Sequence, residues 1–327
     1  MSIFIAMPTM HDLELEPTIL DALNKAHKPE DIYFGIRELT SQESNLKSLE
    51  NRYGNKIRYT ISNIDEHNRL DLIGVGKGRQ AVANLYDGED YILSIDSHTL
   101  FSDGWDTTLI NLYGKAIYET NNVKTIITAY PAKYSYETGS REFKDKTNLY
   151  PYIGFDEEVD LISHKFLKIP LYKVSPPWMC KPFVDTAKEL IPATKFAYNF
   201  SFSGLNFFDD EDPELVMMEE DMCKTLKLLD DGWELVYPNL DYPILGHLYV
   251  TEISELGGGR ASWRDFVNNE EQEMLEQREA ENMWRYIEKY RDTAQRYEKW
   301  VQCRFNSEDK HNMYIPESWF YDSPLGT

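Results

Sequence analysis

Short apolar runs and helical spacings alternate along the first 130 residues of the chain. Ile19, Leu20, Leu23 and Ala26 recur at the spacing of a helix that begins with Pro17 at its first position, and residues 78–86 also read as a helix. The apolar runs are rich in β-branched and aromatic residues, which favours strands over residues 2–7, 32–36, 57–61, 91–95 and 123–130. This alternation predicts an α/β sheet with crossover helices.

The alternation of predicted strands and helices stops after residue 130 and returns near residue 200. Residues 131–200 are rich in Pro and Tyr and read as an insertion of loops and short strands. Beyond them, the pattern predicts an apolar strand at 200–204, a helix over 219–230 and a strand over 233–237. We therefore expect one domain over residues 1–256 that carries the insertion.

The remaining segment, residues 257–327, has a different composition. Three glycines at 257–259 predict a flexible hinge, and residues 266–305 are dense in Glu, Gln, Lys and Arg. An apolar stripe recurs there at alternating steps of four and three: Met283, Ile287, Tyr290, Ala294, Tyr297 and Val301. This spacing predicts one long amphipathic helix that packs either on the main domain or on another subunit of a homo-oligomer.

Composition narrows the class of protein. The 327 residues include 22 Tyr, 15 Phe and 7 Trp, which is typical of a globular chain with a large core. A net charge of −22 disfavours broad binding to polyanions, although a local basic groove is compatible with it. The sequence has no apolar run long enough to span a membrane, and its three cysteines are widely spaced. We expect a cytoplasmic protein with reduced thiols and no membrane partner.

The apolar run at residues 91–95 ends abruptly in Asp96, Ser97 and His98. Ligands gather at the carboxyl ends of strands in open α/β sheets, and side chains two residues apart in extended backbone point to the same side. A carboxylate and an imidazole can therefore bind one cation together, and this pair of ligands suits Mn²⁺ or a similar divalent ion. An ordinary solvated turn is the alternative for an Asp-x-His motif taken alone.

Four blocks of sequence resemble the GlcNAc-transferase family that includes cytosolic enzymes glycosylating hydroxyproline, glycosyltransferase family 60. The second block is the most specific, because it contains Gly78-Arg79, the motif from Ile95 to His98, and Gly104-Trp105-Asp106. The others are residues 3–36, Phe202-Ser203-Gly204 with Glu219-Glu220-Asp221, and Tyr237-Pro238 with Gly246-His247-Leu248-Tyr249. The resemblance implies a GT-A fold, which is a Rossmann-like mixed sheet, and a retaining transfer from a UDP-sugar with Mn²⁺ or Mg²⁺ as cofactor.

The resemblance also implies roles for single residues. Asp96, His98 and His247 resemble the metal ligands, and Glu220 and Asp221 match paired acids that act on the sugar or acceptor, with Glu219 as the alternative if the alignment slips by one. An acidic first turn favoured by the helix dipole is the structural explanation for these acids. The candidates for donor binding are Met7, Thr9, Asp12, Lys77, Arg79, Ser97, Arg260 and Trp263. Among them, Lys77 is expected in a flexible glycine-rich loop near the donor, and Arg260 and Trp263 in a segment that closes over it.

The acceptor is open at this stage. A protein hydroxyl follows from the family analogy. Transfer to hydroxymethylated pyrimidines in DNA, as by a phage-type enzyme, is the next alternative and requires a local basic groove, for which the sequence offers Arg141, Lys144, Lys146, Lys165 and Lys168. A glycan acceptor follows, and a non-catalytic sugar-nucleotide-binding module is the alternative of another class.

Overall fold

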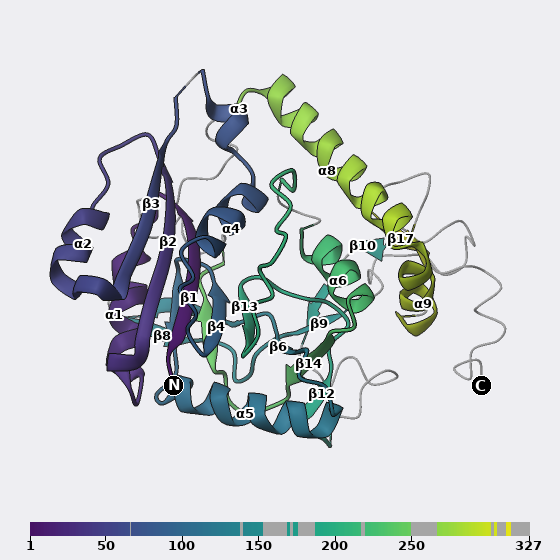
Figure 1. Cartoon of the computed structure of the whole chain (residues 1–327), viewed down its shortest axis with the longest axis horizontal. Coiled ribbons are helices and arrows are strands. Elements are labelled where there is room, and N and C mark those ends of the chain that lie inside the picture. Colours follow the sequence, from purple (N-terminus) through teal and green to yellow (C-terminus); the bar gives the residue numbers. More distant parts are fainter. Residues whose placement is uncertain are drawn as a thin grey trace.

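An eight-stranded mixed sheet forms the centre of the chain (Figure 1). The computed structural model describes residues 1–65, 67–137, 140–152, 169–170, 173–175, 187–216, 220–249, 267–301, 304–305 and 312–314. The strand order is β12-β14-β6-β13-β4-β1-β2-β3. The strands are β1 (Ile3–Met10), β2 (Ile32–Thr40), β3 (Ile57–Asn63), β4 (Tyr91–Ile95), β6 (Thr125–Thr128), β12 (Leu190–Pro192), β13 (Phe200–Ser203) and β14 (Glu234–Pro238).

Parallel pairing of β4, β1, β2 and β3 explains the apolar runs in the sequence. Ile5 lies in register with Phe34 on one side and Leu93 on the other, and all three side chains are fully buried. Parallel strands that are covered on both faces carry continuous rather than alternating apolar residues. The predicted strands are confirmed, and β1 continues through Met10, beyond its predicted end at residue 7.

The sheet changes direction at β13, which runs antiparallel to both β4 and β6. Phe202 of β13 pairs with Leu93 on one side and Ile127 on the other. At the far edge, β12 is antiparallel to β14, whereas β14 is parallel to β6. The fold is therefore an α/β architecture with a mixed sheet, as the sequence predicts.

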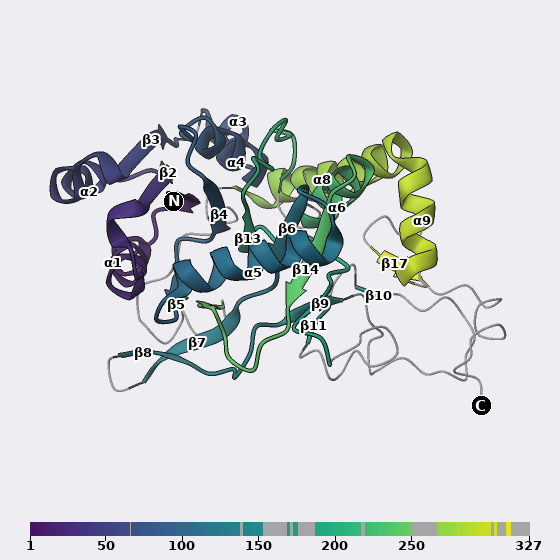
Figure 2. The ribbon, with the colours of Figure 1, turned by 60° about the horizontal axis from the view of Figure 1, so that its bottom comes forward.

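Helices in the first half of the chain cover this sheet. They are α1 (Leu15–Lys25), α2 (Leu46–Tyr53), α3 (Arg69–Leu72), α4 (Val75–Ala83) and α5 (Trp105–Thr120), with short 3₁₀ turns at Pro29–Asp31 and Gly54–Lys56. Helix α4 packs on β1 and β2, and α5 lies across β6 and β14 (Figure 2). The buried Trp105 donates its indole N–H to the carbonyl oxygen of Ala22 at 2.9 Å, which ties α5 to α1. Helix α1 begins at Leu15, two residues before the predicted Pro17.

A second, four-stranded sheet has the order β5-β15-β7-β8. Its strands are β5 (Thr99–Phe101), β15 (Leu245–His247), β7 (Ala132–Glu137) and β8 (Ser140–Phe143). The pairing of β15 with β5 places His247 opposite Thr99. Further short strands are β9 (Tyr150–Tyr152) with β11 (Lys173–Ser175), and β10 (Ile169–Pro170) with β17 (Asn312–Tyr314) and β16 (Arg304–Phe305). The expectation of short strands after residue 130 is thus confirmed.

The C-terminal stripe forms two helices, so the prediction of a single long helix is wrong. Helices α8 (Asn269–Lys289) and α9 (Arg291–Val301) are separated at Tyr290, whose φ of −112° and ψ of 41° leave the helical region. The bend allows both helices to contact α6 (Glu220–Asp230). Met283 and Tyr297 are buried there in one cluster with Met222 of α6. The apolar stripe is therefore covered by α6 of the same chain. The homo-oligomer stays a prediction, but this apolar face is not available to form its interface.

The start of α8 is fixed by polar contacts. Asn268 caps the helix in a reciprocal capping box with Glu271. Glu271 also pairs with Arg69 of α3 at 2.8 Å, and Figure 1 shows α8 running from α3 toward α6. The glycines at 257–259 lie outside the described residues. None of the helices in the described ranges is long and apolar enough to cross a membrane.

Candidate active site and metal centre

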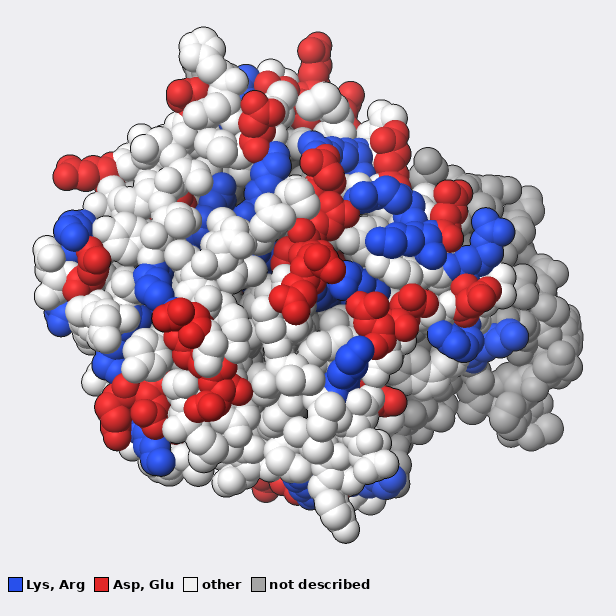
Figure 3. Space-filling view, in the orientation of Figure 1, with Lys and Arg blue, Asp and Glu red and all other residues white. Residues whose placement is uncertain are grey.

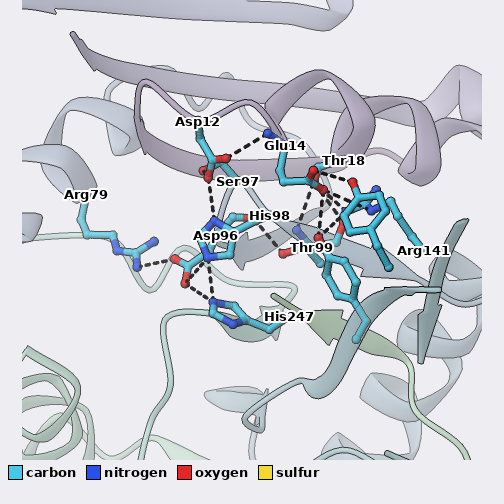
Figure 4. A network of polar contacts seen from close by, with 12 residues as sticks. Asp12, Glu14, Thr18, Arg79, Asp96, Ser97, His98, Thr99, Arg141 and His247 are labelled. Carbon is cyan, nitrogen blue, oxygen red and sulfur yellow. Dashed lines mark hydrogen bonds and ion pairs between the residues drawn. The ribbon is translucent and has the colours of Figure 1, made fainter. Parts of the chain in front are cut away.

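The three predicted metal ligands converge between the two sheets. Asp96 and His98 follow β4 directly, and His247 ends β15. The Nε2 atom of His247 lies 2.9 Å from Asp96 Oδ2 and 2.9 Å from His98 Nε2 (Figure 4). One ligand atom from each of the three residues lies within 4.8 Å of the others. Two imidazole nitrogens and one carboxylate oxygen are a donor set that fits Mn²⁺ and similar divalent ions.

His98 is oriented by Asp12, from the loop after β1. Its Nδ1 lies 2.7 Å from Asp12 Oδ2, which also accepts a hydrogen bond from the Ser97 hydroxyl at 2.7 Å. Burial alone would raise the pKa of Asp12, but the hydrogen bond and charge of His98 hold this pKa well below its usual range. An ionised carboxylate only accepts, so His98 Nδ1 carries the proton. In the neutral form of the ring, Nε2 then carries the lone pair and faces Asp96 and His247, which is the form that a metal ligand requires.

Arg79 of α4 is the buried cation beside this cluster. Its guanidinium lies 3.5 Å from Asp96 Oδ1, on the carboxylate oxygen that does not face His247, and packs 4.5 Å from the centre of the Tyr198 ring. Burial opposes ionisation of Asp96, yet His247, His98 and Arg79 together hold the pKa of Asp96 well below its usual range. The site therefore keeps a charged carboxylate in the position where a cation would bind.

The paired acids lie at the start of α6, beyond Arg79. Glu220 Oε2 is 3.9 Å from Arg79 Nε, and burial raises the pKa of Glu220 well above its usual range. Asp221 faces Tyr130, whose hydroxyl donates to Asp221 Oδ2 at 2.5 Å. Glu219 lies outside the described residues. Two adjacent acids thus have different surroundings, which their sequence positions do not reveal.

The prediction of a flexible loop around Lys77 is wrong. Residues from Val75 onward are helical, and the first N–H groups of α4 donate to the carbonyls of Val216 and Leu215 at 2.8 and 3.1 Å. The glycines serve close packing, since a Cβ on Gly76 would lie 2.0 Å from the carbonyl oxygen of Asp212. Lys77 Nζ donates to the backbone carbonyls of Leu70 and Asp71. The ammonium group of Lys77 is therefore bonded to backbone carbonyls of this chain.

The other donor-binding candidates are placed in different settings. Met7 is fully buried in the core, so its side chain is covered in this structure. Thr9 is 6% exposed, and its hydroxyl has no hydrogen-bond partner among the described residues. Ser97 and Asp12 are bonded to each other. Arg260 and Trp263 fall outside the part of the chain that the structure describes.

A cavity of about 460 Å³ opens at the carboxyl ends of β1 and β2. Its lining includes His11, Asp12, Pro17 and Glu38, so it shares Asp12 with the metal cluster. Glu38 is 3% exposed, and its Oε2 atom lacks a hydrogen-bond partner in the described ranges. Sequence reasoning missed Glu38, which lies within β2, two residues beyond the predicted strand 32–36, although a carboxylate near the carboxyl end of a strand was a usable signal.

A second polar network links the hairpin β7–β8 to the metal cluster (Figure 4). Glu14 accepts hydrogen bonds from the hydroxyls of Tyr134 and Tyr136 and lies 3.3 Å from Arg141 Nε. Arg141 also donates to the carbonyl oxygen of Thr99 at 2.7 Å, one residue after His98. Arg141 is thus largely buried and paired, so its assignment to an open basic groove is wrong. Lys165 and Lys168 lie outside the described residues.

Comparison with known proteins gives a match to one family and a likeness in fold to solved structures. The sequence model of the family described as Glycosyltransferase (GlcNAc) matches residues 71–313, which is more than half of the chain. The structure of GalNAc-T7 with UDP, GalNAc and Mn²⁺ shares the fold, with a TM-score of 0.50 at 12% identity. That alignment covers 76% of this chain but only 43% of the GalNAc-T7 chain.

Two further comparisons concern a second solved structure and the curated protein sequences. S. aureus TarS 1–349 in complex with UDP aligns at 13% identity and a TM-score of 0.45, covering 92% of this chain and 71% of that chain. No significant match to a curated protein sequence is found. The mixed α/β sheet is that of a GT-A glycosyltransferase, as the sequence resemblance implies.

Proposed function

Because the chain belongs to the Glycosyltransferase (GlcNAc) family, we propose that it is a divalent-metal-dependent, retaining glycosyltransferase. In this proposal it moves a sugar from a UDP-sugar to a hydroxyl group of a macromolecular acceptor. The observation that carries the proposal is the convergence of Asp96, His98 and His247, with ligand atoms within 4.8 Å, beside the buried Arg79. A non-catalytic sugar-nucleotide-binding module does not require the buried acids at the start of α6.

The side chains of Asp96, His98 and His247 would hold the cation, Mn²⁺ or Mg²⁺. When bound, the ion would supply positive charge that stabilises the departing nucleoside diphosphate. Arg79 adds a fixed positive charge on the same side, since it is buried and lies within 3.5 Å of Asp96. Asp12 keeps the His98 ring in the required tautomer and orientation.

The nucleoside has a suitable place in the 460 Å³ cavity at the ends of β1 and β2. This cavity adjoins the metal cluster through Asp12, so a diphosphate on the cluster would reach a nucleoside there. Buried polar atoms without partners are costly, and a bound base or ribose would satisfy them. Within the described ranges, Glu38 Oε2 in the cavity lining is such an atom.

The proposed reaction exchanges one bond at the anomeric carbon for another. The bond between this carbon and the diphosphate oxygen breaks, and its electron pair leaves with UDP. The acceptor oxygen forms the new bond to the same carbon, and its proton passes to the departing phosphate. Retention of configuration brings the two oxygens to one face of the sugar, which permits this proton transfer.

A protein hydroxyl is the acceptor that we propose, by analogy with the family. Of the basic residues proposed for a DNA groove, Arg141 is largely buried and paired with Glu14, whereas Lys144 and Lys146 are exposed. Figure 3 also shows Lys and Arg interleaved with Asp and Glu on the face drawn, rather than gathered in a broad basic field. Broad electrostatic binding to DNA would require such a field.

Turnover of nucleotide sugars tests the proposal. The protein is incubated with Mn²⁺ and a panel of nucleotide sugars, and released diphosphate is measured. We expect one UDP-sugar to be consumed, EDTA to stop its turnover, and Mn²⁺ to restore it. Asp96→Asn and His247→Ala should abolish metal-dependent nucleotide binding while Tm shows an intact fold. Full activity in EDTA would contradict the metal assignment.

A further inference from the structure

The guanidinium group of Arg79 points toward Asp96 but is only loosely bound by polar groups of the chain (Figure 4). Its Nη1 atom donates to Ser94 Oγ at 3.4 Å, and its Nη2 atom lies 3.5 Å from Asp96 Oδ1. Its Nε atom has no hydrogen-bond partner in the part of the chain that the structure describes. These contacts are longer than the usual distance of about 2.9 Å. A further group must therefore hold this side chain, which is only 3% exposed.

Tyr198 is that group. It lies between β12 and β13, is 2% exposed, and its ring centre is 4.5 Å from the central carbon of the Arg79 guanidinium. A guanidinium over an aromatic ring is attracted to the ring face, and the attraction is strongest where both groups are removed from water. Contact with a ring face also leaves the N–H donors of the guanidinium unused. The ring therefore restrains Arg79 while keeping its donors available for a ligand.

The Tyr198 ring is itself fixed at both ends. Its hydroxyl donates to Glu211 Oε2 at 2.6 Å, and its backbone carbonyl accepts from Ser94 Oγ at 2.6 Å. The other carboxylate oxygen of Glu211 pairs with Lys224 of α6. The side chains of Glu211 and Lys224 are 1% and 3% exposed. Disturbing a buried ion pair is costly, so a shift of the Tyr198 ring would be resisted by this pair.

We infer that Tyr198 is a positioning residue whose ring holds the Arg79 guanidinium beside the metal cluster, where it would meet the diphosphate of the donor. The inference rests on the proposed function. It separates two parts of one side chain: the ring acts on Arg79, and the hydroxyl ties the ring to Glu211. Sequence reasoning gave Tyr198 no role, because it falls in the Pro- and Tyr-rich stretch of residues 131–200.

Variants of Tyr198 separate the ring from the hydroxyl, with UDP affinity in the presence of Mn²⁺ and Tm as the two measurements. Tyr198→Phe keeps the ring but removes the donor to Glu211, so Tm should fall while UDP affinity stays within about twofold. Tyr198→Met removes the ring and should lower UDP affinity about tenfold. Tyr198→Leu is a second variant without the ring, and the same loss is expected.

Phe208→Leu is the matched control. Phe208 is 2% exposed and stacks beside the Tyr198 ring, with ring centres 6.5 Å apart. Its replacement should lower Tm, because a large buried side chain is reduced, and should leave UDP affinity within about twofold. If the loss of UDP affinity follows the loss of Tm across these variants, Tyr198 has only a structural role and the inference is overturned.

A double-mutant cycle tests whether Tyr198 acts through Arg79. Tyr198→Met should lower UDP affinity about tenfold when Arg79 is present and by less than about twofold in an Arg79→Met background. Equal losses in the two backgrounds would show that the ring acts on the nucleotide by another route, and would overturn the inference. Should Arg79→Met not fold, the comparison of Tyr198→Phe with Tyr198→Met decides.

Failure of the inference is distinguishable from failure of the proposed function. A wild-type protein that neither binds UDP with Mn²⁺ nor consumes a nucleotide sugar contradicts the proposed function. The Tm values of the same cycle still test the contact in that case: the losses of Tyr198→Met and Arg79→Met should together exceed the loss in the double variant. Additive losses would show that the ring does not hold Arg79, even in an active transferase.

Discussion

Asp12 Oδ2 lies 2.7 Å from His98 Nδ1, although 86 residues separate the two along the chain. The contact fixes which ring nitrogen of His98 bears the proton and turns Nε2 toward Asp96 and His247. A carboxylate behind a ligating histidine also raises the basicity of the ring. Asp12 therefore orients His98 within the candidate metal site, and its role in nucleoside binding stays a prediction.

Asp12→Asn should weaken Mn²⁺ binding about 10- to 100-fold, because it keeps the shape of the side chain but removes the charge behind His98. Titration of Mn²⁺ followed by electron paramagnetic resonance measures this without any substrate. Ser97→Ala is the matched control, since it removes a hydrogen bond to the same carboxylate and leaves the His98 contact. Wild-type affinity in Asp12→Asn would show that the contact is unimportant for the metal.

Glu220→Gln should become more stable than the wild type as pH rises. Burial raises the folded-state pKa of Glu220, so the folded chain holds this proton more tightly than the unfolded chain does. Below the unfolded pKa of about 4.3, the group is neutral in both states and costs nothing. Above it, the wild type progressively loses stability until the folded pKa is passed. Tm measured against pH should show a gap that widens through this window, and a constant gap would contradict the prediction.

Glu14→Gln should lower the free energy of unfolding by about 3 kcal/mol, because it leaves the largely buried Arg141 without its carboxylate. Urea denaturation followed by fluorescence measures the loss. Glu50→Gln on α2 is the control, since Glu50 pairs with Lys47 in solvent and its loss should not change stability measurably. Similar losses in both variants would mean that the buried Glu14–Arg141 pair contributes no more to the free energy of unfolding than an exposed pair does.

Met283→Ala should cost about 3 kcal/mol, whereas Met274→Ala should stay within about 0.5 kcal/mol. The two methionines lie on the same helix α8, but Met283 is fully buried against α6 and Met274 is 51% exposed. Thermal or urea denaturation compares them directly. Equal stability of the two variants would indicate that α8 does not pack on α6 in solution.

Sequence reasoning located Asp96 and His98 because their relationship is local. Both follow one buried strand, so the strand end and the two-residue spacing were enough to predict a shared cation. His247 required the family resemblance, because only the pairing of β15 with β5 brings it to the cluster. The contact between Asp12 and His98 depends on the path of the loop after β1, which no spacing reveals.

Other predictions failed where tertiary contacts outweigh local pattern. The glycines around Lys77 suggested a flexible loop, but they allow α4 to approach the backbone of residues 212–216 closely. The heptad-like stripe did not reveal the break at Tyr290, because a bent pair of helices preserves the same spacing. The apolar character of each half and its burial were predictable, whereas the angle between them follows from the surface of α6.

The position of β13 has a consequence for how the protein acquires its structure. Ile95 at the end of β4 pairs with Phe200 of β13. In the sheet β13 lies between β4 and β6, although both of these strands come before β13 in the chain. During synthesis, the gap between β4 and β6 therefore stays open until residue 203 has left the ribosome, and the cluster of Asp96, His98 and His247 is completed only when His247 follows. Contacts at such separation slow folding. A nascent chain that stops before residue 200 exposes the unpaired apolar edge of β4, which makes it a target for chaperones and aggregation.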